Sequence, residues 1–195
     1  MLVSLGRGGE NRTPIKSFGD SYATIIPRPY VYLYYNTNTS LFQIFSYNKL
    51  GDYHMIVNYT TKELDLLARL MRAEAQTEGD LGMLMVGNVV VNRVLGDCYT
   101  FKNIDSITDA IYQPNQFVGA DSPLFYASST TTEKNLAKRI LAGEYYYPAT
   151  HSLWFYAPGS SNTTCQQTWY SQPLAGKYKN HCFYRPQAGT CTQIY

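Results

Sequence analysis

The feature that most constrains the fold of this chain is a capped amphipathic pattern that begins at Thr60. Thr60 and Glu63 have the spacing of a capping box, in which each side chain bonds the backbone N–H of the other at a helix start. Apolar residues then recur at steps of three and four: Leu64, Leu67, Leu70 and Met71. This period predicts an amphipathic helix with one buried face, ended by Gly79.

An acidic residue continues the apolar stripe of this helix. Glu74 follows Leu70 by four positions and Leu67 by seven, so it shares their face. A carboxylate there loses hydration, which is costly unless the group has a task. Apolar neighbours raise its pKa, and Glu78 one turn further would raise it again by repulsion if the helix continues that far. Glu74 is therefore the first candidate for chemistry; the alternative is a surface pair of acids.

A raised carboxyl pKa suits the cleavage of a glycosidic bond, which needs an acid that is still protonated at neutral pH. Two carboxylates that share this reaction face each other across the substrate, about 5–5.5 Å apart for retention and about 6.5–9.5 Å for inversion. Glu74 and Glu78 lie on one helix and do not face each other in this way. The pattern indicates one acid, Glu74, that acts first as proton donor and then as base, with Glu78 in a supporting position.

A helix that contains glycine and asparagine is predicted directly afterwards. Asp80 is placed to cap it, and its inner face carries Met83, Val86, Val90 and Val94. Gly82 and Gly87 lower its helix propensity by roughly 1 kcal/mol each, and such glycines permit close helix contact or ligand approach. Asn88 and Asn92 lie one turn apart and share a face, which is either a polar solvent face or part of a groove.

The rest of the chain predicts helices and then a small sheet. A short helix capped by Asp105 or Ser106 precedes a longer one that begins at a second capping box, Thr130–Glu133, and ends at Gly143. Ser152–Tyr156 is the best strand, and turn residues and aromatic side chains follow it. Helices first and a β/loop region afterwards make the fold class α+β.

Residues 1–54 differ from the rest of the chain in composition and in hydrophobic periodicity. They are rich in Tyr, Asn, Thr and Ser without a helical period, whereas the chain is patterned from Met55 onward. Residues 30–35 and 41–45 could pair as a hairpin, which alone would be marginal in water. We interpret 1–54 as a poorly patterned leader, a mis-assigned upstream extension, and 55–195 as the working domain.

Composition excludes several classes of function. A chain of 195 residues fits one domain, and a net charge of +2 is too weak for a nucleic-acid groove. No apolar run is long enough for a membrane span, and the start lacks the pattern of a signal peptide, so we expect cytoplasmic synthesis. Gly-rich phosphate loops, GxSxG and HExxH are absent from the sequence.

The four cysteines predict no metal site. Cys165, Cys182 and Cys191 lie near His181 in the sequence, but their spacing matches no standard zinc pattern. Buried thiols or one late-forming disulfide are the expected states. Nothing in the sequence marks Cys98 as a reactive nucleophile.

Aromatic residues are unusually frequent, with 19 tyrosines. A ring with a polar tip suits sugar surfaces as well as protein cores. We expect four residues to stack on sugar rings: Trp154, Tyr156, Trp169 and Tyr170. The alternative is that the two tryptophans belong to the core.

Several stretches together resemble the SleB/CwlJ-type cell wall hydrolases. They are Leu66–Ala75, Glu78-Gly79, Val86–Val89, Asn92–Val94 and Ile111–Phe117. The tail resembles the short CwlJ branch, the spore-cortex-lytic enzymes, at Ser152–Phe155, Gln167–Pro173 and His181–Tyr184. The likeness runs from about Met55 to Tyr195. One departure is Thr77, where family members often have Gly, and it affects the turn beside Glu78.

The resemblance implies a lysozyme-like helical core followed by a small aromatic-rich β/loop region. It implies cleavage of spore-cortex peptidoglycan during germination, as a lytic transglycosylase or glycosidase, with the acid of the Ala-Glu-Ala motif at Glu74. In the SleB branch one carboxylate protonates the glycosidic oxygen of muramic acid and then deprotonates the 6-hydroxyl of the same sugar. Supporting or substrate-positioning roles are assigned to Glu78, Asn88, Asn92 and Gln116, and substrate binding to Tyr112, Phe117 and the four stacking residues above.

The resemblance also implies a cellular location, a partner protein and an activator. CwlJ-like proteins are made in the mother-cell cytoplasm and placed at the spore coat beside the cortex, with a GerQ-type coat protein as partner. No cofactor is expected, although calcium dipicolinate is implied as an activator; the acids of the chain show no calcium-loop pattern. The alternative function is a non-catalytic spore-coat or peptidoglycan-binding protein that keeps the aromatic groove.

Overall fold

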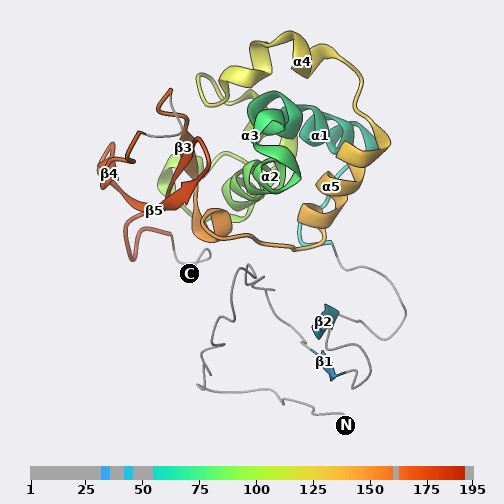
Figure 1. Ribbon diagram of the computed structural model, residues 1–195, viewed down its shortest axis with the longest axis horizontal. Helices are drawn as coiled ribbons and strands as arrows, with labels where there is room; N and C mark the ends of the chain where they lie inside the picture. The colour runs from blue at the N-terminus through green and yellow to red at the C-terminus, as the bar shows by residue number, and fades with distance from the viewer. Residues whose placement is uncertain (1–31, 36–41, 46–54, 160–162, 192–195) are drawn as a thin grey trace.

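The computed structural model describes residues 32–35, 42–45, 55–159 and 163–191. Strands β1 (Tyr32–Tyr35) and β2 (Phe42–Phe45) pair antiparallel, with Tyr32 opposite Phe45, as the sequence predicted. The remainder of 1–54 lies outside the described residues, so its interpretation as an upstream extension stays a prediction. From residue 55 onward a cluster of helices precedes a small curled sheet (Figure 1).

Helix α1 (Thr61–Ala75) begins at the predicted capping box. The Thr60 hydroxyl accepts from the Glu63 N–H at 3.2 Å, and the Glu63 carboxylate accepts from the Thr60 N–H at 2.9 Å. The helix ends earlier than predicted, because a 3₁₀ turn, η1 (Gln76–Glu78), follows Ala75. The chain direction therefore changes between Glu74 and Glu78.

Helix α2 (Gly79–Leu95) is the buried centre of the helical part, with α1 and α5 (Thr131–Leu141) packed against it (Figure 1). A Cβ at Gly87 would lie 3.0 Å from the Ile140 side chain and 3.1 Å from the Met71 sulfur, so this glycine permits the predicted close helix contact. Asp80 lies inside the first turn of α2, not at the cap position as predicted, because the helix already begins at Gly79.

Shorter elements lie between α2 and α5. They are η2 (Tyr99–Phe101), α3 (Ile107–Tyr112), η3 (Val118–Asp121) and α4 (Pro123–Tyr126). Ser106 caps α3, and its hydroxyl accepts from the Asp109 N–H at 3.0 Å. The buried guanidinium of Arg72 on α1 donates to the Ser128 carbonyl at 3.0 Å and pairs with Glu133 at 3.1 Å. Arg72 Nε also donates to the Leu124 carbonyl at 3.1 Å, so these bonds hold the 124–128 segment and the start of α5 against α1.

The C-terminal part is a four-stranded antiparallel sheet in the order β3-β6-β5-β4. After η4 (Ala149–His151) come β3 (Trp154–Tyr156), β4 (Thr168–Trp169), β5 (Gln172–Tyr178) and β6 (His181–Tyr184). All of β6 is buried, and Phe183 packs on α2 through Met85 and Val89. Helices joined to a small curled sheet confirm the α+β class and the helical core that the sequence predicted.

Two disulfides correct the expectation of free thiols or a single bridge. Cys98 is bonded to Cys191, and Cys165 to Cys182. Sequence spacing could not show this, because the fold alone brings Cys98, at the exit of α2, next to a residue 93 positions later. Within the described ranges, no three His, Cys, Asp or Glu side chains are grouped to hold a metal ion.

No helix of the described ranges combines the length and the apolar character that crossing a membrane would require.

Candidate functional site

Glu74 is a half-buried carboxyl in the last turn of α1. Its Oε1 accepts a hydrogen bond from the Gly119 N–H at 2.6 Å. Burial raises the pKa of Glu74 above its ordinary value, while the Gly119 N–H and the charge of Arg93 act in the opposite direction. Because burial prevails, the carboxyl keeps its proton to a higher pH than a solvent-exposed glutamate.

Gly119 is required where it contacts Glu74. A Cβ at this position would lie 2.9 Å from Glu74 Oε1 and 3.0 Å from the backbone carbon of Ala73. Only a residue without a side chain lets the backbone N–H of η3 approach the carboxylate this closely. The Gly119 N–H of η3 therefore orients the Glu74 carboxylate.

Arg93, near the end of α2, is a site residue that the sequence reasoning missed. It is 2% exposed, its Nε donates to the Leu153 carbonyl at 2.8 Å, and its guanidinium lies 5.0 Å from the Phe101 ring and 4.6 Å from the Phe117 ring. Burial lowers its pKa to about 9, so it stays charged at neutral pH. A cation inside an apolar helical stretch was the available signal, by the argument that singled out Glu74.

A pocket of about 480 Å³ adjoins Arg93. It brings together residues from four stretches of the chain, namely Arg93, Thr100, Asn115, Gln116, Trp154, Phe155, Trp169, Tyr170 and Gln172. Four of the predicted site residues are among them: Gln116, Trp154, Trp169 and Tyr170. We call this cavity the aromatic pocket.

Two other aromatic residues predicted to bind substrate, Tyr156 and Phe117, lie near this pocket but do not line it. Tyr156 stacks on Tyr184 at 5.7 Å between ring centroids and contacts Trp169 at 5.0 Å. Phe117 is buried beneath the guanidinium of Arg93. Tyr156 packs against Trp169, and Phe117 packs against Arg93, so each contacts a residue that lines the aromatic pocket.

Glu78 does not contribute to the pKa shift of Glu74, because α1 does not continue as far as Glu78, the condition on which the sequence expectation depended. Its buried carboxylate accepts from the Asn180 N–H at 3.2 Å, and its backbone carbonyl accepts from Lys179 Nζ at 2.6 Å. The end of α1 at Ala75 turns Glu78 toward the β5–β6 turn. Glu78 therefore links the β5–β6 turn of the sheet to the start of α2 through these two hydrogen bonds.

Asn88 and Asn92 lie neither in solvent nor in a groove, which corrects both alternatives. The Asn88 amide donates to the Glu144 carbonyl at 2.7 Å and accepts from the Tyr146 N–H at 2.9 Å. The Asn92 amide nitrogen lies within 3.2 Å of three backbone carbonyls between 149 and 152. Both are buried, and they fix the segment that leads from α5 to β3.

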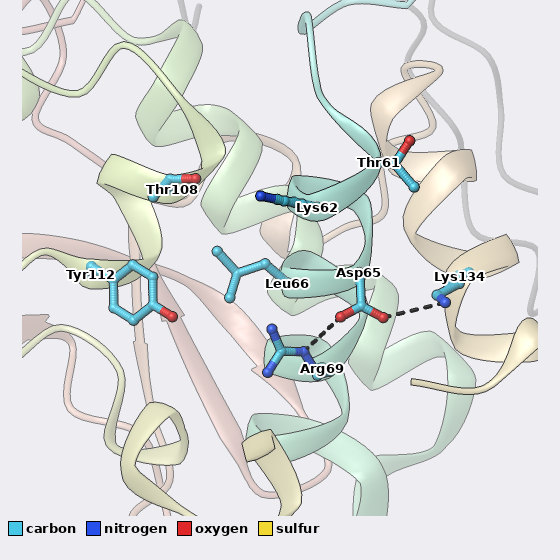
Figure 2. Close-up of a pocket in the computed structure, with 8 residues that line it drawn as sticks. All are labelled: Thr61, Lys62, Asp65, Leu66, Arg69, Thr108, Tyr112 and Lys134. Atoms are coloured by element: carbon cyan, nitrogen blue, oxygen red, sulfur yellow. Dashed lines mark ion pairs between the residues drawn. The ribbon is translucent and has the colours of Figure 1, made fainter. Parts of the chain in front are cut away.

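Tyr112 lies at a different pocket, of about 510 Å³, between α1, α3 and α5. Figure 2 shows its ring facing Leu66 and Arg69, with the ion pairs of Asp65 to Arg69 and Lys134 alongside. The structure therefore does not bring Tyr112 together with the residues of the aromatic pocket.

The arrangement around Glu74 provides one acid and one neighbouring cation. Asp and Glu, Glu74 included, are absent from the described residues that line the aromatic pocket, so the pocket lining holds no paired acid and nucleophile. A carboxyl that is protonated to higher pH can give a proton to a leaving oxygen and later accept one.

Comparison with known proteins identifies relatives in sequence. A family model described as Cell Wall Hydrolase matches residues 77–184, a range that begins just after Glu74. The chain is similar to the cell wall hydrolase CwlJ of Oceanobacillus iheyensis, with 45% identity over 141 residues that cover 72% of this chain and 98% of that protein. It is similar to CwlJ of Bacillus subtilis, with 43% identity over 140 residues that cover 72% and 96%.

Solved structures share the fold. The catalytic domain of the Bacillus cereus SleB protein matches with a TM-score of 0.53 at 23% identity, over 66% of this chain and 93% of that one. The catalytic domain of the germination-specific lytic transglycosylase SleB from Bacillus anthracis matches with a TM-score of 0.52 at 21% identity, over 66% and 98%. At these identities the likeness is one of architecture.

Proposed function

The chain belongs to the cell wall hydrolase family, and we therefore propose that it cleaves the glycan strands of peptidoglycan with Glu74 as its single acid and base. The observation that carries the proposal is the half-buried Glu74 carboxyl, whose pKa burial raises and which interacts electrostatically with Arg93. Arg93 in turn borders the aromatic pocket, which Glu74 itself does not line. The resemblance to SleB and CwlJ proteins favours lytic transglycosylase or glycosidase chemistry at this carboxyl.

In the proposed reaction Glu74 gives its proton to the glycosidic oxygen, and the bond between that oxygen and the anomeric carbon breaks. The carboxylate that remains is stabilised by the Gly119 N–H and the positive charge of Arg93. It then takes a proton from the attacking hydroxyl. If that hydroxyl is the 6-hydroxyl of the cleaved sugar, an anhydro end forms; if it belongs to water, a reducing end forms.

The aromatic pocket supplies the proposed binding surface for the sugars. Trp154 and Trp169 are half-buried and Tyr170 is 83% exposed, so the pocket presents both fixed and accessible rings. Sugar rings stack on such faces, while the amides of Gln116 and Gln172 can donate to and accept from their hydroxyls.

The proposed setting is the spore. By resemblance, the substrate is cortex peptidoglycan, the time is germination, the place is the boundary of coat and cortex, and the partner is a GerQ-type coat protein. Calcium dipicolinate as activator rests on the resemblance alone. The described residues offer no cluster of acids suited to calcium, so no step is assigned to the ion.

Replacing the acid tests the proposal. Decoated spore cortex is treated with the wild type, with Glu74→Gln and with Asp80→Asn, which neutralises an exposed acid elsewhere. Because the amide has no proton to donate, Glu74→Gln should release muropeptides about 10²–10⁴-fold more slowly, and Asp80→Asn should match the wild type. Mass analysis of the fragments distinguishes anhydro-muramic ends from reducing ends.

The aromatic pocket also fits the alternative of a binding protein without turnover. Equal release by the wild type and Glu74→Gln would remove Glu74 from the chemistry. Absence of release by every variant, with cortex still bound, would favour the binding protein.

A further inference from the structure

The Ser122 hydroxyl is not used in the way that its place in the chain suggests. Ser122 is the N-cap of α4 and directly precedes Pro123 at the helix start. A serine there usually accepts a hydrogen bond from a backbone N–H of the first turn, but this bond is absent from the described residues. Instead, the Ser122 hydroxyl donates to the Gly119 carbonyl at 2.7 Å, and the Ser122 N–H donates to the same oxygen at 3.0 Å. Both donors of Ser122 therefore act on η3.

The residue that Ser122 holds is the one that bonds the acid. The Gly119 N–H donates to Glu74 Oε1 at 2.6 Å, and the Gly119 carbonyl is the oxygen that accepts from Ser122. Glycine has the most mobile backbone of all residues and has no side chain that could fix it. The two bonds from Ser122 limit this freedom, so they help to decide whether the N–H stays on the carboxyl.

Helix α1 holds the other end of this arrangement. Arg69 Nη1 donates to the Phe125 carbonyl at 2.9 Å, and Arg72 holds the same segment through the bonds given above. Phe125 belongs to α4, the helix that Ser122 begins. Hydrogen bonds therefore run from α1 to α4, from Ser122 to η3, and from η3 back to α1 at Glu74.

The Gly119 bond also decides which oxygen of Glu74 carries the proton. Oε1 accepts from the N–H, and in a neutral carboxyl the carbonyl oxygen is the better acceptor, so the proton lies on Oε2. After the proton has left, the bond to Oε1 becomes charge-assisted and stronger. The position of η3 therefore affects both the direction of the proton and the stability of the carboxylate.

We propose that Ser122 is a positioning residue for Glu74: its hydroxyl keeps Gly119 where the N–H meets Oε1, so that the carboxyl presents its proton from Oε2. This inference rests on the proposed function, which makes Glu74 the acid. Removal of the hydroxyl should loosen η3 and lengthen the bond to Oε1, while the carboxyl itself stays in place.

The ionisation of Glu74 reports on this bond without requiring turnover. The ¹³C resonance of the Glu74 carboxyl is followed against pH in the wild type and in Ser122→Ala. A longer bond stabilises the ionised form less, so the proton affinity of Glu74 should rise about threefold or more, part of the roughly tenfold or larger effect of losing a charge-assisted bond. Arg93, the charged group that acts on Glu74, and Asp121, the exposed acid of η3, are unchanged in both proteins.

Two further serine variants serve as matched controls. Ser122→Thr keeps the hydroxyl, and a β-branched residue suits the extended backbone before a proline, so Glu74 should titrate as in the wild type. Ser106→Ala removes the cap of α3, a serine hydrogen bond that does not involve η3. It should lower the stability without changing the titration of Glu74.

Two other readouts follow the same bond. The Gly119 amide ¹H resonance should move as Glu74 ionises, and it should move less in Ser122→Ala. Muropeptide release by Ser122→Ala should fall about tenfold, less than the 10²–10³-fold that loss of a whole catalytic donor costs. Because the acid works in its protonated form, the fall of its activity at alkaline pH should shift to higher pH.

Three results overturn the proposal. They are an unchanged titration of Glu74 in folded Ser122→Ala, a Ser122→Thr protein that titrates like Ser122→Ala, and an equal rise of proton affinity in Ser106→Ala. Absence of muropeptide release by every protein, with the titrations as expected, would count against the proposed function and leave the positioning of the carboxyl by Ser122 supported.

Discussion

At the scale of single residues, the site depends on a carboxyl under opposing influences. Burial favours the neutral form of Glu74, while the Gly119 N–H and Arg93 favour the ionised form. An acid for glycosidic cleavage needs both influences. Its carboxyl must be protonated before the step, and its carboxylate must be stabilised after the step. The apolar stripe of α1 accounts for the first influence, and two other segments of the chain provide the second.

The raised pKa of Glu74 predicts a pH-dependent stability. Between the unfolded and folded pKa values the native state holds a proton that the unfolded chain has released, so the native state loses stability as the pH rises through this interval. Glutamine does not ionise and escapes this loss. We expect the melting temperature of Glu74→Gln, relative to the wild type, to increase from pH 4 to pH 7.

Calorimetric scans at several pH values check this expectation. Arg93 stays charged throughout the range, since its pKa is about 9, so Glu74 is the only member of this pair whose charge changes. A difference in melting temperature that does not change with pH would contradict the raised pKa.

At the scale of elements, local signals located the helices, and long-range contacts changed their ends. The capping boxes at Thr60 and Thr130 mark the starts of α1 and α5 as predicted. The end of α1 at Ala75 was missed, because the bonds of Glu78 to Asn180 and Lys179 join segments about 100 positions apart. The roles of Asn88 and Asn92 were missed for the same reason, since their partners lie beyond α5.

The disulfide between Cys98 and Cys191 should contribute strongly to stability. It joins the exit of α2 to the last described segment across 93 positions, and a cross-link over a loop of this length constrains the unfolded chain. We expect the double change Cys98→Ser/Cys191→Ser to lower the free energy of unfolding by about 2–5 kcal/mol.

Denaturant titration of the oxidised proteins measures this loss. A reducing agent should destabilise the double variant less than the wild type, because only the Cys165–Cys182 bridge is left in it. Equal stability of the wild type and the double variant under oxidising conditions would contradict the prediction.

At the scale of the whole molecule, the described core lies after residue 54. Every described core cluster draws its members from Met55 onward, and the family match lies within 77–184. We expect a variant of residues 55–195 to melt within about 2 °C of the full chain, a shift of well under 1 kcal/mol, and to release muropeptides at the same rate. A large fall in either quantity would show that residues 1–54 belong to the working protein.

The sequence by itself determined the helices, their order before a small sheet, and the acid on an apolar stripe, because capping and periodicity are local properties of the chain. Only the tertiary structure decided which groups meet Glu74. Arg93 and Gly119 come from α2 and η3. The packing of the fold also decided which rings meet Arg93 at the aromatic pocket, among them Trp154, Trp169 and Tyr170 from the C-terminal sheet and its loops. Such contacts arise from packing between distant segments, and no local pattern records them.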